Sequence, residues 1–93
     1  MRKYELMTIF PLEEDLSKPA LEAVRATLKE FNAEVESEQP FGDRDLTYEV
    51  QKRTKGRFVL FTINVNPAKI IEIDRAFKLN QNLMKFMFVR IDE

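Results

Sequence analysis

The clearest structural pattern in this sequence lies between residues 58 and 67 and reads Phe58-Val59-Leu60-Phe61-Thr62-Ile63-Asn64-Val65-Asn66-Pro67. Every second residue from Val59 to Val65 is apolar, and this period of two predicts a strand over 58–65 with one buried face. Asn66 followed by Pro67 is a typical helix start, because asparagine caps the first turn and proline suits the first helical position. A buried strand therefore leads directly into a helix.

Downstream of this stretch the spacing of the apolar residues changes from that of a strand to that of a helix, and then returns to that of a strand. Ile70, Ile73 and Phe77 recur at helical spacing and predict a buried helical stripe. Asn80-Gln81-Asn82 ends that helix, and residues 83–91, rich in Phe, Met and Val, predict a last strand.

Upstream, Gly56 is predicted to occupy a turn that follows a long extended segment over 35–52. This segment is expected to bend at Pro40-Phe41-Gly42, because proline cannot donate to a central ladder. The second half of the segment alternates cleanly, so one face is predicted to carry Leu46, Tyr48 and Val50.

The amino-terminal part predicts a further strand and helix. Leu6, Thr8 and Phe10 alternate with their neighbours and predict a first strand. A helix is expected over about 17–31, with Ser17 as N-cap, Pro19 in its first turn and Asn32 in the left-handed position that ends it.

The resulting order of elements is βαββαβ. Two helices can cover only one face of four strands, so the prediction is an α+β fold of ferredoxin-like type. It consists of a four-stranded antiparallel sheet with both helices on one face. The length of 93 residues and the lack of any linker predict a single domain over residues 1–93.

The face of the sheet without helices is expected to be unusually apolar. If the helices cover the side of Leu6, Tyr48 and Phe61, alternation places the other apolar residues on the bare face. Contiguous exposed apolar area marks a protein partner, although scattered exposed residues need no function. The residues expected on this face are Met7, Ile9, Phe58, Leu60, Met87 and Val89.

Charge is divided unevenly along the chain. Residues 1–50 hold 6 basic and 12 acidic side chains, a net of -6, whereas residues 51–93 hold 9 and 4, a net of +5. The total of -1 therefore conceals a local basic feature around Gly56 that is suited to phosphate contacts. The absence of a targeting segment or a long apolar run predicts a cytoplasmic protein without a membrane span.

The composition argues against catalysis. The chain has no Cys and no His, which removes the thiol nucleophile and the commonest general base and metal ligand. No glycine-rich phosphate loop is present, so no cofactor, small-molecule substrate or catalytic residue is predicted. Glu34, Glu36 and Glu38 at strand spacing are interpreted as a solvated or guarded edge rather than a metal site. An enzyme or ligand-binding module of the same fold is a remote alternative.

Basic side chains at the ends of the predicted strands are the candidates for contact with RNA or with a partner. One further residue, Phe58, could stack on a base, because 55–61 partly resembles the signature of RNA-recognition motifs, although it is one residue short. Tyr4 is a second candidate for packing or stacking. The candidate cations are Arg2, Lys3, Arg44, Lys52, Arg53, Lys55, Arg57, Lys85 and Arg90.

The whole chain resembles the bacterial small-subunit ribosomal protein S6 family. Four segments carry the resemblance, in the order and spacing of the family. The opening is similar to M-R-x-Y-E, and the second segment to G-x-R-x-L-A-Y-x-I-x-K. The third is the turn into the third strand, and the last is similar to N-x-N-V-L-R-x-x-x-V-R. In this chain they are Met1-Arg2-Lys3-Tyr4-Glu5, residues 42–52, Lys55-Gly56-Arg57-Phe58 and residues 80–90.

This resemblance implies a structural constituent of the small (30S) ribosomal subunit that acts in translation and subunit assembly. It further implies binding to the central domain of 16S ribosomal RNA together with ribosomal protein S18, as a heterodimer. The chain departs from the family pattern at Asp45, Thr47, Glu49 and Lys85. Asp45 stands where a cation is common, and Lys85 keeps a charge but lacks the bidentate fork of arginine. The alternative is a free-standing binder of single-stranded RNA that resembles an RNA-recognition motif.

Overall fold

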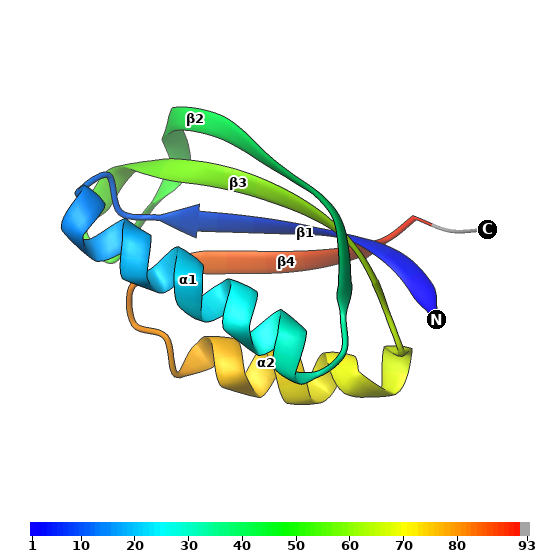
Figure 1. Cartoon of the computed structure of the whole chain (residues 1–93). Coiled ribbons are helices and arrows are strands. Elements are labelled where there is room, and N and C mark those ends of the chain that lie inside the picture. Colours follow the sequence, from blue (N-terminus) through cyan, green and yellow to red (C-terminus); the bar gives the residue numbers. More distant parts are fainter. Residues whose placement is uncertain (92–93) are drawn as a thin grey trace.

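The computed structural model describes residues 1–91 and has the predicted order of elements (Figure 1). The four strands form one sheet in the order β2-β3-β1-β4, and each neighbouring pair is antiparallel. Both helices lie on the same side of this sheet (Figure 1). The ferredoxin-like prediction is therefore confirmed. The elements are β1 (Arg2–Phe10), α1 (Glu14–Glu30), β2 (Glu34–Val50), β3 (Arg53–Val65), the short 3-10 helix η1 (Pro67–Lys69), α2 (Ile70–Lys78) and β4 (Lys85–Arg90).

The strand register confirms which side chains face the helices. Leu6 of β1 lies opposite Phe61 of β3 and Phe88 of β4, and Leu6 and Phe61 are fully buried beneath the helices. Met7 lies opposite Leu60 and Met87 on the other face. Since neighbours along a strand point to opposite faces, the predicted parity of the fourth strand is correct.

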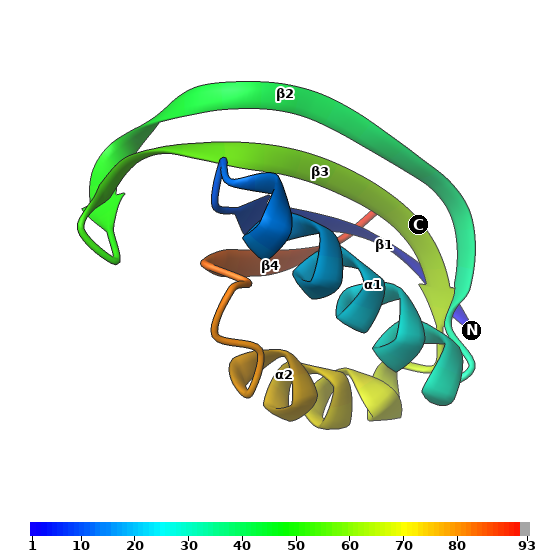
Figure 2. The ribbon, with the colours of Figure 1, turned by 60° about the vertical axis from the view of Figure 1, so that its left-hand side comes forward.

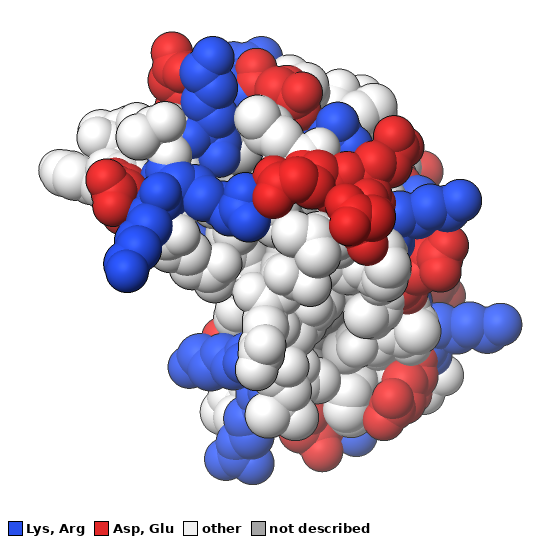
Figure 3. Space-filling view, turned by 90° about the vertical axis from the view of Figure 1, so that its left-hand side faces the viewer, with Lys and Arg blue, Asp and Glu red and all other residues white. Residues whose placement is uncertain are grey.

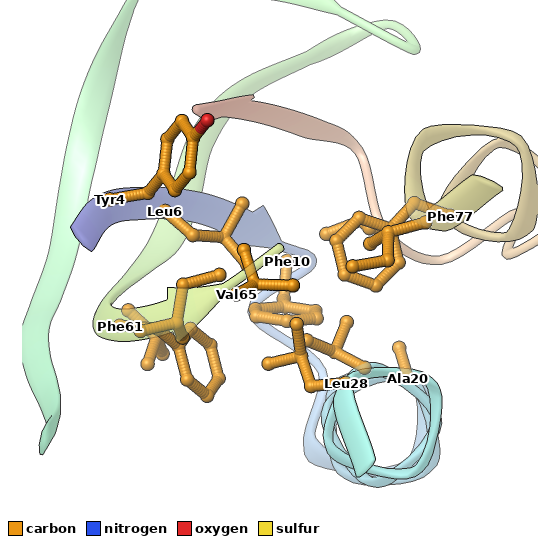
Figure 4. Packing of buried hydrophobic residues seen from close by; sticks show 13 residues of the cluster. Tyr4, Leu6, Phe10, Ala20, Leu28, Phe61, Val65 and Phe77 are labelled. Carbon is orange, nitrogen blue, oxygen red and sulfur yellow. The ribbon is translucent and has the colours of Figure 1, made fainter. Parts of the chain in front are cut away.

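The core fills the space between the sheet and the helices (Figure 4). Leu28 of α1 and Phe77 of α2 are buried against the inner face of the sheet, where Phe10 and Val65 are also buried. The predicted helical stripe on α2 is confirmed by Ile73 and Phe77, and the side chain of Asn66 caps η1 by accepting a hydrogen bond from the Ala68 N–H at 3.0 Å.

The start of α1 differs from the prediction. The N–H groups of Leu16 and Ser17 already donate to the Glu13 carbonyl, so the helix begins at Glu14 and Ser17 is not its N-cap. Acidic residues in the first turn favour this earlier start through the helix dipole. Pro19 consequently lies inside the helix. The predicted end is correct, because Asn32 has the left-handed φ of 59°.

The β2–β3 hairpin is longer than predicted and bends at its tip (Figure 2). Gln51 and Lys52, both with positive φ, form the turn. Three irregularities bend β2, and the one at Pro40–Gly42 confirms the predicted bend. Because the distal part of the hairpin leaves the layer that the helices cover, Tyr48 is 78% exposed, and its predicted place beneath the helices is wrong.

Gly56 is also not in a turn: it lies within β3, opposite Arg44, and is buried. A Cβ atom built on Gly56 would lie 2.5 Å from Cγ2 of Ile9, so only glycine allows the hairpin to approach β1 this closely. The hairpin covers Ile9 as a result, and Ile9 is buried rather than exposed on the open face.

We expect Gly56→Ala to lower the free energy of unfolding by about 2 kcal/mol, because the added methyl group overlaps Ile9 in a packed contact. Denaturant unfolding measures this value. The double variant Ile9→Ala/Gly56→Ala should be destabilised by less than the sum of its single changes. Strict additivity would show that the contact with Ile9 is not the cause.

Candidate nucleic-acid and protein interface

The open face of the sheet carries a continuous row of side chains across all four strands. Gln39 pairs with Leu60, Leu60 with Met7, and Met7 with Met87, so the four side chains stand side by side. Met87 is 56% exposed and Val89, on the same face, is 44% exposed. Three of the four side chains, Leu60, Met7 and Met87, are apolar, and we call them the apolar row. An open face of an antiparallel sheet is usually polar, and the apolar row is therefore suited to a protein partner.

A groove of about 370 Å³ lies at the hairpin end of this face. Met7 and Met87 of the sheet form part of it, and Leu46 and Tyr48 of the curled hairpin form another part. Phe58 is half-buried and contributes to the lining, so its ring does not stand alone on an open surface. The groove thus continues the apolar row toward the basic residues of the hairpin.

The hairpin arginines are held by other groups of the chain. Arg53 Nη1 donates to Glu13 Oε1 at 2.7 Å, and Arg57 Nε donates to Asp43 Oδ1 at 3.1 Å. Arg57 Nη1 also donates to Ser17 Oγ at 3.3 Å. Ser17 therefore accepts a hydrogen bond from the hairpin instead of capping α1. Arg44 lies over the ring of Phe41, 5.6 Å from its centroid. These contacts fix the arginines before any ligand arrives.

Three lysines near the hairpin differ from the ion-paired arginines because no carboxylate of the described residues holds them. Lys52, Lys55 and Lys85 are exposed and make no ion pair within residues 1–91. Lys85 joins this group because β4 begins opposite Ile9, at the hairpin end of the sheet. We call these three residues the hairpin lysines. Figure 3 shows basic and acidic side chains intermixed at this end of the molecule, above a largely uncharged surface.

The remaining predicted cations lie at the opposite end of the sheet. Arg2 pairs with Val65, and Arg90 pairs with Tyr4, whereas Arg57 pairs with Phe10. At about 3.3 Å per residue, the length of β1 separates the two groups by roughly 26 Å. The predicted approach of Arg2, Lys3 and Arg90 to one another is consistent with this register. The structure does not bring them together with the hairpin.

Two glutamates of β2, Glu36 and Glu38, have specific partners. Glu36 accepts hydrogen bonds from Asn64 and from Lys3, and these two donors lower the pKa of Glu36 below its ordinary value. Glu38 accepts both donors of the Arg25 fork, which raises the pKa of Arg25. No cluster suited to a metal ion occurs among residues 1–91. These carboxylates tie the edge strand to β1, β3 and α1.

The ion pair between Arg53 and Glu13 lowers the pKa of Glu13, mainly because the guanidinium donates to the carboxylate. A depressed pKa in the folded state means that the pair stabilises the fold above the ordinary value of 4.5, and that this contribution is lost as the pH falls through the folded pKa. We expect Arg53→Gln to raise the Glu13 pKa toward 4.5, as measured by NMR titration of its carboxyl. An unchanged pKa would show that the pair does not form in solution.

Sequence reasoning missed three residues at this site, namely Glu13, Asp43 and Tyr48. Glu13 lies 40 residues from Arg53 along the chain, and no local sequence pattern predicts their contact. Asp43 opposes Arg57 only because β2 carries a bulge, which shifts the register from that of a regular hairpin. The place of Tyr48 in the groove could be predicted only from the knowledge that the hairpin leaves the layer that the helices cover.

None of the helices in residues 1–91 combines the length and the apolar character that crossing a membrane requires.

Comparison with known proteins gives consistent matches over nearly the whole chain. The family model described as Ribosomal protein S6 matches residues 3–90. The small ribosomal subunit protein bS6 of Treponema denticola is 54% identical over 93 residues, which is 100% of both chains. The bS6 protein of Treponema pallidum is 40% identical over 99% of both chains. The crystal structure of 30S ribosomal protein S6 from Thermotoga maritima superposes with a TM-score of 0.86 at 18% identity, covering 97% of this chain and 87% of that one.

Proposed function

The chain belongs to the ribosomal protein S6 family, and on this premise we propose that it binds 16S ribosomal RNA jointly with ribosomal protein S18. Membership makes it a structural protein of the small ribosomal subunit, which functions in translation in the bacterial cytoplasm, and not an enzyme. The finer proposal concerns which surfaces it uses. The protein partner covers the open face of the sheet, and the RNA contacts the hairpin lysines.

This proposal rests on the apolar row formed by Leu60, Met7 and Met87 on the face without helices, in which Leu60 and Met7 are half-buried and Met87 is exposed. A net charge of -1 provides little non-specific attraction to RNA, so the chain alone is expected to bind RNA weakly. A partner that covers the apolar row adds its own charge and surface to the complex. Joint binding therefore fits both the charge and the exposed face.

The hairpin lysines are the cations best placed for phosphate contacts. They are exposed and make no ion pair among residues 1–91, whereas the arginines must first leave Glu13 or Asp43. Arg53 and Arg57 stay candidates whose contact with RNA would replace a carboxylate by a phosphate. Arg44 also stays a candidate, and it would first leave the ring and carbonyl of Phe41. Arg2, Lys3 and Arg90 lie at the far end of the sheet and would contact a separate segment of RNA or the partner.

We expect the triple variant Lys52→Gln/Lys55→Gln/Lys85→Gln to lower the salt dependence of RNA binding by the chain with S18. Each lost phosphate contact reduces the slope of log K against log salt by about 0.7–0.9, so the slope should fall by roughly 2–3. Binding to 16S RNA is measured over a range of salt concentrations. The matched control replaces three lysines on the helices, Lys18, Lys29 and Lys78, by glutamine and should keep the slope. Equal slopes for both variants would contradict these contacts.

Measuring RNA binding by the chain without S18 tests the alternative function. A free-standing binder of single strands would bind RNA without S18 and would lose stacking of the order of 1–3 kcal/mol in Phe58→Ala. The half-buried position of Phe58 in the groove disfavours this reading. If RNA binds neither to the chain alone nor to the chain with S18, the proposed function is wrong.

A further inference from the structure

The outer edge of β4 has unpaired backbone groups. The Ile91 N–H donates to the Lys3 carbonyl at 3.0 Å, so this opposing pair is hydrogen-bonded. In an antiparallel ladder every second residue of a strand bonds to the same neighbour. Val89 and Met87 therefore bond to β1, and the N–H and C=O groups of Phe86 and Phe88 point away from the sheet. No partner for these groups occurs within residues 1–91.

The two edges of the sheet differ in their protection. At the other edge β2 carries Pro40, a positive φ at Gly42 and three shifts of register, all of which obstruct the addition of a strand. The β4 edge has a regular register from Lys85 to Arg90, with no proline, bulge or acidic residue. Among residues 1–91, no strand lies beyond β4 (Figure 1). An exposed, regular, apolar edge is a template for a further strand.

We propose that the β4 edge accepts an extended segment of the partner protein as a fifth strand of the sheet. This inference rests on the proposed function and adds the place and the mode of docking. The backbone groups of Phe86 and Phe88 supply the hydrogen bonds, and Met87 and Val89 supply the apolar contacts on the open face. Main-chain bonds then give affinity, and alternate side chains give specificity.

The position of the apolar row favours a partner protein over a second copy of this chain. Two copies paired through β4 would extend the sheet sideways and would leave its open face uncovered, including Met7 and Leu60 on β1 and β3. A partner that lies over the open face and adds one strand at its edge covers the whole row. The edge and the face are thus parts of one interface.

Backbone N-methylation tests this mode without changing a side chain. A synthetic chain with an N-methyl group on Phe88 loses an outward N–H but keeps every bond between β1 and β4. We expect its affinity for S18 to fall by about tenfold or more. The matched control carries the N-methyl group on Glu14, the first residue of α1, where a missing N–H costs nothing. Its affinity should stay within about twofold.

Amide hydrogen exchange gives a second readout on the unmodified chain. In the free protein the amides of Met87 and Val89 should be protected and that of Phe88 should exchange fast. Addition of S18 should slow the Phe88 amide by about tenfold or more. Binding of S18 with an unchanged Phe88 amide and an undiminished affinity of the N-methyl variant would overturn the edge inference and leave the proposed function standing.

Three other outcomes also bear on the proposal that the β4 edge accepts a strand of the partner. If the unmodified chain does not bind S18, the proposed partnership and this inference fall together. If the chain alone forms a dimer in which the Phe88 amide is protected, the occupant of the edge is a second copy, and the inference is wrong. If the N-methyl variant does not fold, the exchange measurement on the unmodified chain decides.

Discussion

Replacing Phe77 by alanine is expected to lower the free energy of unfolding by about 3–5 kcal/mol. Phe77 is fully buried on α2, and its ring contacts two aromatic rings of β4, with centroid distances of 5.2 Å to Phe86 and 6.1 Å to Phe88. Alanine leaves a cavity between α2 and β4 that neighbouring backbone cannot fill (Figure 4). Urea unfolding followed by circular dichroism measures the loss.

The control for this change is Phe41→Ala, which removes the same side chain from a half-exposed site on β2. Its ring contacts Arg44 at the surface, and its loss should cost at most about 1 kcal/mol. The Phe77 variant is also expected to bind S18 less tightly, because β4 rests on this aromatic cluster. Similar losses of stability for Phe77 and Phe41 would contradict the described core.

The second large effect is expected for Met87→Glu, which should weaken the binding of S18 by about 100-fold. Met87 lies at the exposed end of the apolar row, and a buried carboxylate without a partner in the interface costs several kcal/mol. The stability of the free chain should change little, because the side chain is already more than half exposed. Calorimetric titration with S18 and urea unfolding separate these two quantities.

Ile71→Glu is the matched control for Met87→Glu. Ile71 is 63% exposed on α2, in the helix layer and away from the open face. The same change of apolar to acidic side chain should leave S18 binding within about threefold of the unmodified chain. If Ile71→Glu weakened binding as much as Met87→Glu, the partner would dock on the helix layer, and the proposed use of the open face would be wrong.

Much of the fold follows from alternation and helical spacing. Val59, Phe61, Ile63 and Val65 alternate so regularly that one face of β3 could be assigned as buried, and the structure confirms it. Two helices for four strands then leave one face bare. The assignment of Met87 and Val89 to that face followed from the same parity and is correct.

The errors lie where a local pattern competes with contacts distant in sequence. Ser17 is a good N-cap residue, but Glu13 and the acidic first turn start α1 earlier, and Ser17 contacts Arg57 instead. Gly56 is a typical turn residue, yet the turn lies at residues 51–52, and Gly56 serves a close approach within β3. In both cases the sequence indicated a residue with a special structural role, but the role in the structure is a contact with a distant segment instead of a cap or a turn.

The sequence alone determined the order of the elements, the buried faces of β1 and β3 and the excess of apolar residues on the open face, because each depends on the periodicity of a single segment. Tertiary structure decided the rest. Three features depend on which segments meet in space: the bend of the hairpin over Ile9, the ion pair between Arg53 and Glu13, and the bare edge of β4. Segments 40 or more residues apart carry no periodic signal of their meeting, since only the assembled sheet sets their register.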